Sequence, residues 1–176
     1  MKKKARKKIP ATKLPTPERI LRAASECLLN LGYPRTTVKE IAARADVPQG
    51  LIHHHFGSKE NLFCSVIDDL NREIAERNHP PKPRDPEEFK RLQRHFRLFV
   101  EFVAMAPHMP EVARALKVFI QKRKDQVKER MEIEEDGQAF FLMSFLVGMS
   151  VLSLGYPGLP VQKIQKHLQE HFPDFF

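Results

Sequence analysis

The chain has no tryptophan, two tyrosines and two cysteines among its 176 residues. Two cysteines cannot form the dense disulfide framework of a small secreted protein, so we expect a reducing, cytoplasmic location. Cys27 and Cys64 both fall on apolar helix faces, where buried thiols are the ordinary interpretation and a redox switch the alternative. The sequence also lacks a glycine-rich phosphate loop, metal-type cysteine spacing and any motif for nucleophilic catalysis. We therefore predict a protein that is not an enzyme and that needs no cofactor.

Positive charge, in contrast, is abundant and unevenly distributed. The net charge is +8, and residues 1–79 contain 15 Lys and Arg against 9 Asp and Glu, whereas residues 80–176 contain 15 against 13. The excess begins with MKKKARKK, within residues 1–15, which we expect to form a disordered basic arm. No apolar segment follows these charges, so they are not a signal peptide. A polyanion-binding protein is expected to be basic at its binding end, although a basic tail is also typical of a merely solvated terminus.

The segment 37–63, TVKEIAARADVPQGLIHHHFGSKENLF, predicts three helices in quick succession. Thr37 and Glu40 form a capping box that starts the first helix. Pro48 suits the start of the second, because its fixed φ fits a first helical turn. Ser58 then caps a third, longer helix. Two short helices joined by a tight turn form a helix-turn-helix, whose second helix fits the major groove of DNA; a helical hairpin inside a bundle is the alternative.

A long match to one protein family extends over this segment and the helix before it. The matching pieces are ERILRAASECLLNLGY, TTVKEIAARADV and GLIHHHFGSKENL, within residues 17–64. They closely resemble the DNA-binding domain of the TetR family of bacterial transcriptional regulators. The resemblance implies an all-α protein with an N-terminal three-helix helix-turn-helix domain at 16–64. It also implies a C-terminal helical domain at 65–176 that binds an effector and forms a dimer.

Three residues depart from the family pattern within the helix-turn-helix. Asp46 stands where glycine is usual in the turn, and aspartate tolerates a left-handed backbone better than most residues. Pro48 replaces a common serine and has neither a hydroxyl nor an N–H to offer a phosphate. His53 replaces the usual tyrosine, which weakens the expected phosphate contact or makes it pH-sensitive. The fold is compatible with all three, but the list of DNA contacts is changed by them.

The resemblance assigns roles to residues around the second helix. It implies that Thr37 and Lys59 hold phosphates, and the amide end of the helix after Ser58 suits an anion. Gln49 is a candidate to pair with adenine and Leu51 to touch a thymine methyl. The predicted DNA-binding set is Thr37, Pro48, Gln49, Gly50, Leu51, His53, His54 and Lys59. Three consecutive histidines, 53–55, do not predict a metal site, because neighbouring helical residues point about 100° apart.

The C-terminal part is rich in phenylalanine. A helix predicted at 86–106 is apolar nearly all round in its second half and is followed by an apolar stripe at 112–131. Pockets between bundle helices are lined in this way, which predicts a small apolar effector. The candidate lining residues are Phe96, Phe99, Phe102 and Phe119, for which an ordinary core position is an equally open interpretation.

Residues 138–155 contain no charge over eighteen positions. That length approaches a membrane span, but serines and a glycine dilute it, and no positive residues flank it. The resemblance favours a helix buried in a homodimer, and we predict no membrane attachment. The predicted interface residues are Phe141, Phe145, Gly148, Leu152, Ile164 and Leu168.

The sequence as a whole predicts a nucleoid-associated, homodimeric regulator that binds a palindromic operator in double-stranded DNA. Repression relieved by a small apolar effector is the expected mode of action. The alternative is a helical protein that binds a small molecule or a partner and has lost specific DNA binding, because residues 46, 48 and 53 depart from the family pattern.

Overall fold

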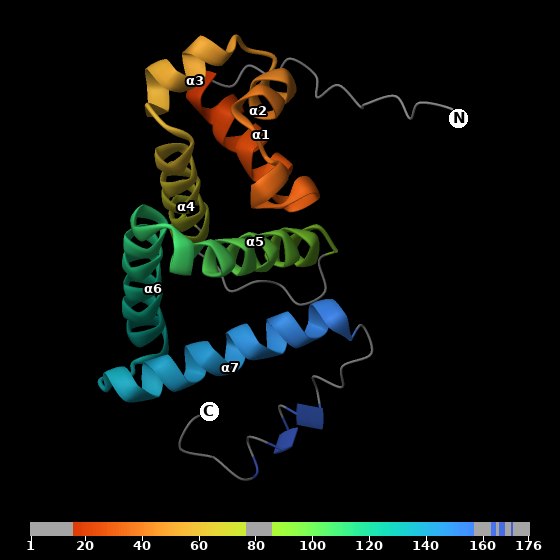
Figure 1. Ribbon diagram of the computed structural model, residues 1–176. Helices are drawn as coiled ribbons and strands as arrows, with labels where there is room; N and C mark the ends of the chain where they lie inside the picture. Colours follow the sequence, from red (N-terminus) through yellow and green to blue (C-terminus); the bar gives the residue numbers. More distant parts are fainter. Residues whose placement is uncertain (1–15, 77–85, 157–162, 165, 168–169, 171–176) are drawn as a thin grey trace.

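The computed structural model describes residues 16–76, 86–156, 163–164, 166–167 and 170. The secondary structure assigned to this part of the chain is helical throughout, as predicted (Figure 1). The N-terminal helices are α1 (Thr16–Leu31), α2 (Val38–Ala45), α3 (Gln49–Phe56) and α4 (Lys59–Ala75), with a short 3-10 helix, η1 (Tyr33–Arg35), after α1. The C-terminal helices are α5 (Pro86–Met105), α6 (Pro110–Met131) and α7 (Asp136–Gly155), with η2 (Ala106–His108) before α6.

Local sequence signals fix the ends of the short N-terminal helices. The side chain of Thr37 accepts a hydrogen bond from the amide of Glu40 at 3.1 Å, which confirms the predicted cap of α2. Ser58 likewise accepts from the amide of Asn61 at 3.0 Å and caps α4. Pro48 is the N-cap of α3 and not its first helical residue. The Thr37 and Ser58 caps each satisfy an amide that would otherwise have no partner at the start of a helix, whereas Pro48 makes no side-chain cap hydrogen bond.

A continuous hydrophobic core joins the N-terminal helices to α5 and α6. Phe63 of α4 is fully buried, and its ring lies 6.5 Å from that of Phe102 on α5, which is 1% exposed. Burying a side chain of this size contributes about 1.5–3 kcal/mol. Phe102 therefore occupies the core that holds the two parts of the chain together.

Helix α4 belongs to both parts of the molecule. It contacts α1 and α3 on one side and α6 on the other, and Figure 1 shows it descending from the N-terminal helices to the junction with α5 and α6. The boundary predicted between residues 64 and 65 falls inside this unbroken helix. The backbone and the core therefore both continue across the predicted boundary.

Helices α5 and α7 lie one above the other, and α6 runs along one end of both (Figure 1). Glu132 ends α6 in a left-handed conformation, with φ of 55°. Asp136 starts α7 and is held by Lys124 and Lys128 of α6, the latter at 2.7 Å. No helix in the described part of the chain is long and apolar enough to cross a membrane.

Candidate nucleic-acid interface and pocket

The turn between α2 and α3 has a defined backbone. Asp46 adopts the left-handed conformation expected for it, with φ of 56° and ψ of 52°. The amide of Val47 then donates to the carbonyl of Ala42 at 3.1 Å. Arg19 of α1 donates to the carbonyls of Ala45 and Asp46 at 2.7 and 2.9 Å. This guanidinium therefore holds the turn against α1, a role that sequence patterns did not reveal because the partners are 26 and 27 residues apart.

Helix α3 divides into a buried side and an exposed side. Ile52 is 1% exposed and fixes the helix to the core. Gln49, Gly50, His53 and His54 are exposed, and Leu51 is half-buried. The predicted base-reading residues therefore lie on one helix. No other protein group lies within 4 Å of the Cβ position of Gly50 on that helix.

His53 faces the end of its own helix. Its Nδ1 lies 3.2 Å from the carbonyl of Gly57, where φ is 75° and the helix stops. A ring nitrogen that donates to this carbonyl is engaged before any phosphate arrives, so the contact made by the usual tyrosine is not simply replaced. The rings of His54 and His55 meet edge to face, with their centroids 5.2 Å apart.

Lys59 is held against Tyr33. Its ammonium lies 3.9 Å from the centre of the tyrosine ring and 3.3 Å from the carbonyl of the same residue. Burial lowers the pKa of the lysine, and the neighbouring Glu60 raises it by less. The side chain is thus oriented at the first turn of α4. Tyr33 was not predicted as a functional residue, since no local pattern links it to a lysine in another helix.

The folded N-terminal domain carries little net charge. Residues 16–64 contain six Lys and Arg and five Asp and Glu, whereas residues 1–15 contain seven basic residues and no acidic ones. Two of the arginines, Arg22 and Arg44, lie 3.3 and 2.9 Å from Glu26. The positive charge predicted at the DNA-binding end therefore resides mainly in the basic arm, which lies outside the described residues.

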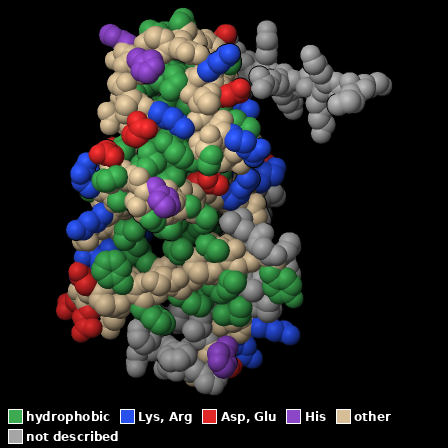
Figure 2. All heavy atoms as spheres, viewed as in Figure 1, with side chains coloured by type: hydrophobic (Ala, Val, Ile, Leu, Met, Phe, Trp, Pro, Cys, Tyr) green, Lys and Arg blue, Asp and Glu red, His purple; other side chains and the backbone are tan. Residues whose placement is uncertain are grey.

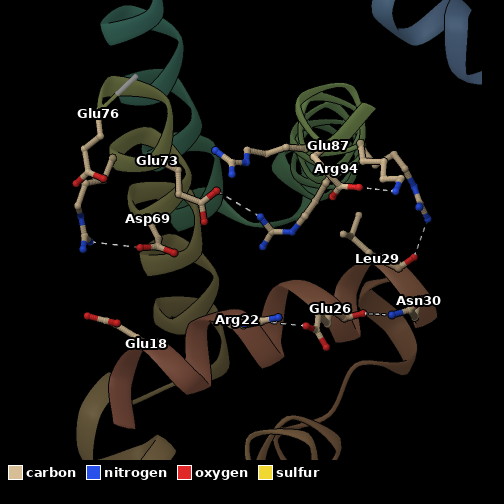
Figure 3. Close-up of a pocket in the computed structure, with 14 residues that line it drawn as sticks. Glu18, Arg22, Glu26, Leu29, Asn30, Asp69, Glu73, Glu76, Glu87 and Arg94 are labelled. Carbon is tan, nitrogen blue, oxygen red and sulfur yellow. Dashed lines mark hydrogen bonds and ion pairs between the residues drawn. The ribbon is translucent and has the colours of Figure 1, made fainter. Parts of the chain in front are cut away.

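A charged cleft of about 1020 Å³ is lined by residues of α1, α4 and α5 (Figure 3). Glu73 of α4 accepts from Arg94 at 3.3 Å and lies 2.8 Å from Nε2 of His95, both on α5. The pKa of Glu73 is lowered, chiefly by its hydrogen bond to His95, with burial opposing and Arg94 adding to the effect. Arg97 donates to the carbonyl of Leu29 at 3.1 Å. These contacts connect α5 directly to both α4 and the last turn of α1.

A second, smaller pocket of about 220 Å³ lies among α4, α5, α6 and α7. Its walls include Phe96, Phe99 and Phe119, three of the four predicted lining residues. The rings of Phe99 and Phe119 lie 5.9 Å apart. Phe102, the fourth, is not among the lining residues, because it points into the core beside Phe63. The pocket also includes His95 and Arg123, which the sequence did not single out.

Helix α7 leaves apolar side chains exposed. They are Phe140, Phe141, Leu146, Val151 and Leu152, between 41% and 57% exposed, and Figure 2 shows hydrophobic side chains gathered on the lower half of the molecule. Of the predicted interface, Phe141 and Leu152 are thus exposed, and Phe145, Gly148 and Ile164 are half-buried. Leu168 lies outside the described residues.

The histidines at the end of α3 are not gathered into a metal-binding group. Among the residues that the structure describes, no three His, Cys, Asp or Glu side chains are placed to hold one ion. The two cysteines are both free thiols, Cys27 buried and Cys64 half-buried, and burial raises the pKa of each.

Comparison with known proteins agrees with this geometry. Residues 20–66 match the domain described as bacterial regulatory proteins, tetR family. The transcriptional repressor Rv3405c of Mycobacterium tuberculosis is 34% identical over 93 residues, which is 53% of this chain and 49% of the repressor. The chain thus spans about half the length of the curated relatives it matches.

Two solved structures have the same fold over most of the chain. A TetR-family regulator from Rhodococcus sp. has a TM-score of 0.71 at 15% identity, covering 91% of this chain and 97% of its own. The multidrug binding protein EbrR complexed with ethidium has a TM-score of 0.60 at 20% identity, covering 81% and 90%. At these identities the likeness shows the fold.

An exposed second helix on a capped helix-turn-helix, followed by a helical C-terminal part, is an architecture that suits DNA recognition. The family match is confined to this N-terminal part: residues 20–66 carry a domain of the tetR family of bacterial regulatory proteins.

Proposed function

We propose that the protein is a homodimeric, sequence-specific DNA-binding repressor that a small effector releases from its operator. The observation that supports DNA binding most strongly is the exposed side of α3, where Gln49, Gly50 and His54 are open to solvent beside the buried Ile52. A helix held in this way suits the major groove, in which each base pair presents a distinct pattern of donors and acceptors.

The contacts would divide between bases and phosphates. Gln49 pairs with adenine, Leu51 touches a thymine methyl and His54 is the third residue that faces a base edge. Thr37 and Lys59, at the starts of α2 and α4, hold the phosphate backbone, which sets register without reading sequence, and Pro48 and His53 lie beside the backbone on α3. Because the folded domain has little net charge, the basic arm supplies most of the non-specific attraction.

The exposed apolar side of α7 supports the dimer. Phe141 and Leu152 lie on it, and a second copy related by a two-fold axis would bury the same residues on both subunits. Gly148 has nothing within 4 Å of its missing Cβ, which leaves room for a helix from the partner to approach closely. The two-fold axis would then impose an inverted repeat on the operator.

The small pocket beside Phe96, Phe99 and Phe119 is the proposed effector site. A structural neighbour is described in complex with ethidium, an aromatic small molecule, which supports ligand binding by this fold. The pocket shares α4 with the DNA-binding domain through Leu70 and Ile74. An effector that favours one position of α4 would change the orientation of α3, and operator DNA would weaken effector binding by the same factor.

Selection of operators from random double-stranded DNA tests the proposal. The full chain should enrich an inverted repeat whose half-site centres are about one helical turn apart or a multiple of it. Titrations at several salt concentrations should then show a preference of about 10³-fold or more over scrambled DNA. Failure to enrich any sequence would favour the alternative, a helical ligand-binding protein that no longer reads DNA.

A further inference from the structure

We infer that the small pocket among α4, α5, α6 and α7 binds an apolar monocarboxylate, whose carboxylate pairs with Arg123. The inference concerns the effector site and so rests on the proposed function for its regulatory meaning. The effector predicted from the sequence is only described as apolar, and the inference adds that it carries one negative charge. The observations behind it are two buried guanidinium nitrogens of Arg123 without a hydrogen-bond partner, the missing acidic partner of this residue among the described residues and the composition of the pocket walls.

The side chain of Arg123 is half-buried, and its guanidinium is only partly hydrogen-bonded. Its Nη2 donates to the carbonyl of Asn71 on α4 at 3.3 Å. Its Nε and Nη1 are buried and have no hydrogen-bond partner within the described part of the chain. No Asp or Glu among those residues forms an ion pair with it. A buried guanidinium is stable when a carboxylate pairs with it, often through two parallel hydrogen bonds.

Nearby carboxylates already have other partners. Asp136 is held by Lys124 and Lys128, and Asp125 lies 3.6 Å from the first of these lysines. Glu73 is bonded to Arg94 and His95 at the mouth of the charged cleft. The twelve residues that line the small pocket include no acidic one, so its only formally charged side chain is the cation of Arg123.

Buried polar atoms without a hydrogen-bond partner are concentrated beside the small pocket. All five buried side-chain atoms without a partner in the described residues belong to Asn71, His95 and Arg123. His95 and Arg123 both line the pocket, and the carbonyl of Asn71 accepts from Arg123. Buried polar groups in folded proteins are nearly always hydrogen-bonded, and exceptions mark a strained or functional site. Burial also lowers the pKa of Arg123, and the like charge of Arg130 adds to this; an anion would oppose both effects.

The remaining walls define the rest of the ligand. Phe96, Phe99 and Phe119 supply flat apolar surface, and Met143, Leu146 and Val147 of α7 close the opposite side. The guanidinium lies 5.6 Å from the centre of the Phe119 ring, which orients it at one end of the aromatic wall. A volume of about 220 Å³ suits a ligand with one ring or a short alkyl chain. The predicted ligand thus has an apolar body and one anionic end.

Arg123 and His95 are also hydrogen-bonded to α4, the helix that belongs to both parts of the molecule. Arg123 is tied to α4 through Asn71, and His95 is tied to α4 through Glu73. A carboxylate that draws the guanidinium toward itself competes with the long hydrogen bond to Asn71. The ligand's charged end therefore acts on the helix that continues from α3, which gives the anion a direct route to operator affinity.

Matched probes test the charge preference. 3-Phenylpropanoate and octanoate would each be compared with the alcohol and the amine of the same skeleton, by calorimetry on the full chain at neutral pH. At least one acid should bind roughly tenfold or more tightly than its alcohol and its amine, as one charge-assisted hydrogen bond implies. Equal affinities within both series, or no binding by either acid, would overturn the inference.

Variants locate the preference. Arg123→Gln should lower the affinity of the acid to that of the alcohol and leave the alcohol unchanged, while Arg123→Lys should keep part of the preference. Arg114→Gln on the same helix is the control, because that side chain is 74% exposed and should not matter. A preference that survives in both Arg123 variants, each shown to be folded by circular dichroism, would assign the anion elsewhere and contradict the inference.

Operator binding separates the two proposals. A protein that shows an Arg123-dependent acid preference but no preferred DNA sequence would leave this site intact and remove the proposed function. A protein that selects an operator but binds acids and alcohols alike would keep the proposed function and remove the carboxylate site.

Discussion

The two halves of the molecule differ in how completely their groups are satisfied within one chain. In the N-terminal half, Thr37 and Ser58 cap their helices, Arg19 holds the turn, and Lys59 lies on Tyr33. In the C-terminal half, α7 exposes a row of apolar side chains, and two buried guanidinium nitrogens of Arg123 have no hydrogen-bond partner among the described residues. Under the proposed function, the first half presents the DNA-binding surface, whereas the second half would be completed by another copy of the chain and by a ligand.

The exposed side of α7 provides the largest expected effect. Leu152→Glu would place a charge in the proposed dimer interface, where burying an unpaired carboxylate costs several kcal/mol, on the order of 3–5. Sedimentation at micromolar concentration should show a monomer, and operator affinity should fall with it. Val118→Glu is the control, since Val118 is also 50% exposed but lies on α6. A dimer that tolerates Leu152→Glu would mean that this face is not the interface.

The two phenylalanine environments can be compared by truncation. Phe63→Ala should destabilise the protein by about 3–5 kcal/mol, because Phe63 is fully buried between Tyr33 and Phe102. Phe119→Ala should cost less, because one side of that ring already faces the pocket and has fewer contacts to lose. Urea midpoints of the two variants measure the difference. Equal losses would indicate that the pocket wall is packed as tightly as the core.

The basic arm tests whether the folded N-terminal domain is sufficient for specificity. Each phosphate that a protein neutralises adds about −0.9 to the slope of log affinity against log salt. Deleting residues 2–8, which carry six Lys and Arg, should flatten this slope and leave base preferences unchanged. Filter-binding titrations between low and moderate salt would measure it. An unchanged slope would show that the arm does not touch DNA.

The junction of α6 and α7 gives the smallest effect and depends on pH. Hydrogen bonds from Lys124 and Lys128 lower the pKa of Asp136 from 3.8 to about 2. A carboxyl whose pKa is lower in the folded state adds stability above its unfolded pKa, and this is lost as pH falls from about 4 to 2. Asp136→Asn should therefore lower Tm at pH 6 slightly and by less near pH 3. A constant difference across this range would exclude the ion pairs as the cause.

The sequence predicted features that depend on neighbouring residues. The caps at Thr37 and Ser58 and the left-handed Asp46 follow from residue type at a local position, and the structure has all three. Contacts between distant segments were not predictable in this way. Arg19 meets the turn across 26 residues, and Arg123 meets Asn71 across 52.

The phenylalanines of the C-terminal half illustrate the same limit. Helical periodicity places Phe99 and Phe102 on neighbouring faces of α5, but it does not say which face meets a pocket and which meets α4. The packing of α5 against its neighbours places Phe102 beside Phe63 of α4 in the core, while Phe99 lines the pocket. The half-buried Arg123 was missed because arginine in a helix ordinarily faces solvent.

The central claim is that α3 reads bases while its surroundings hold phosphate, and Gln49→Ala tests it most directly. Operator selection with this variant should lose the preference at one base pair in each half-site, at a cost of about 1–3 kcal/mol on the best operator. Lys59→Ala, its matched control, should weaken all sequences alike and retain every base preference. If the operator selected by Gln49→Ala is the same at every position as that of the unaltered chain, α3 does not read DNA through this residue and the account is contradicted.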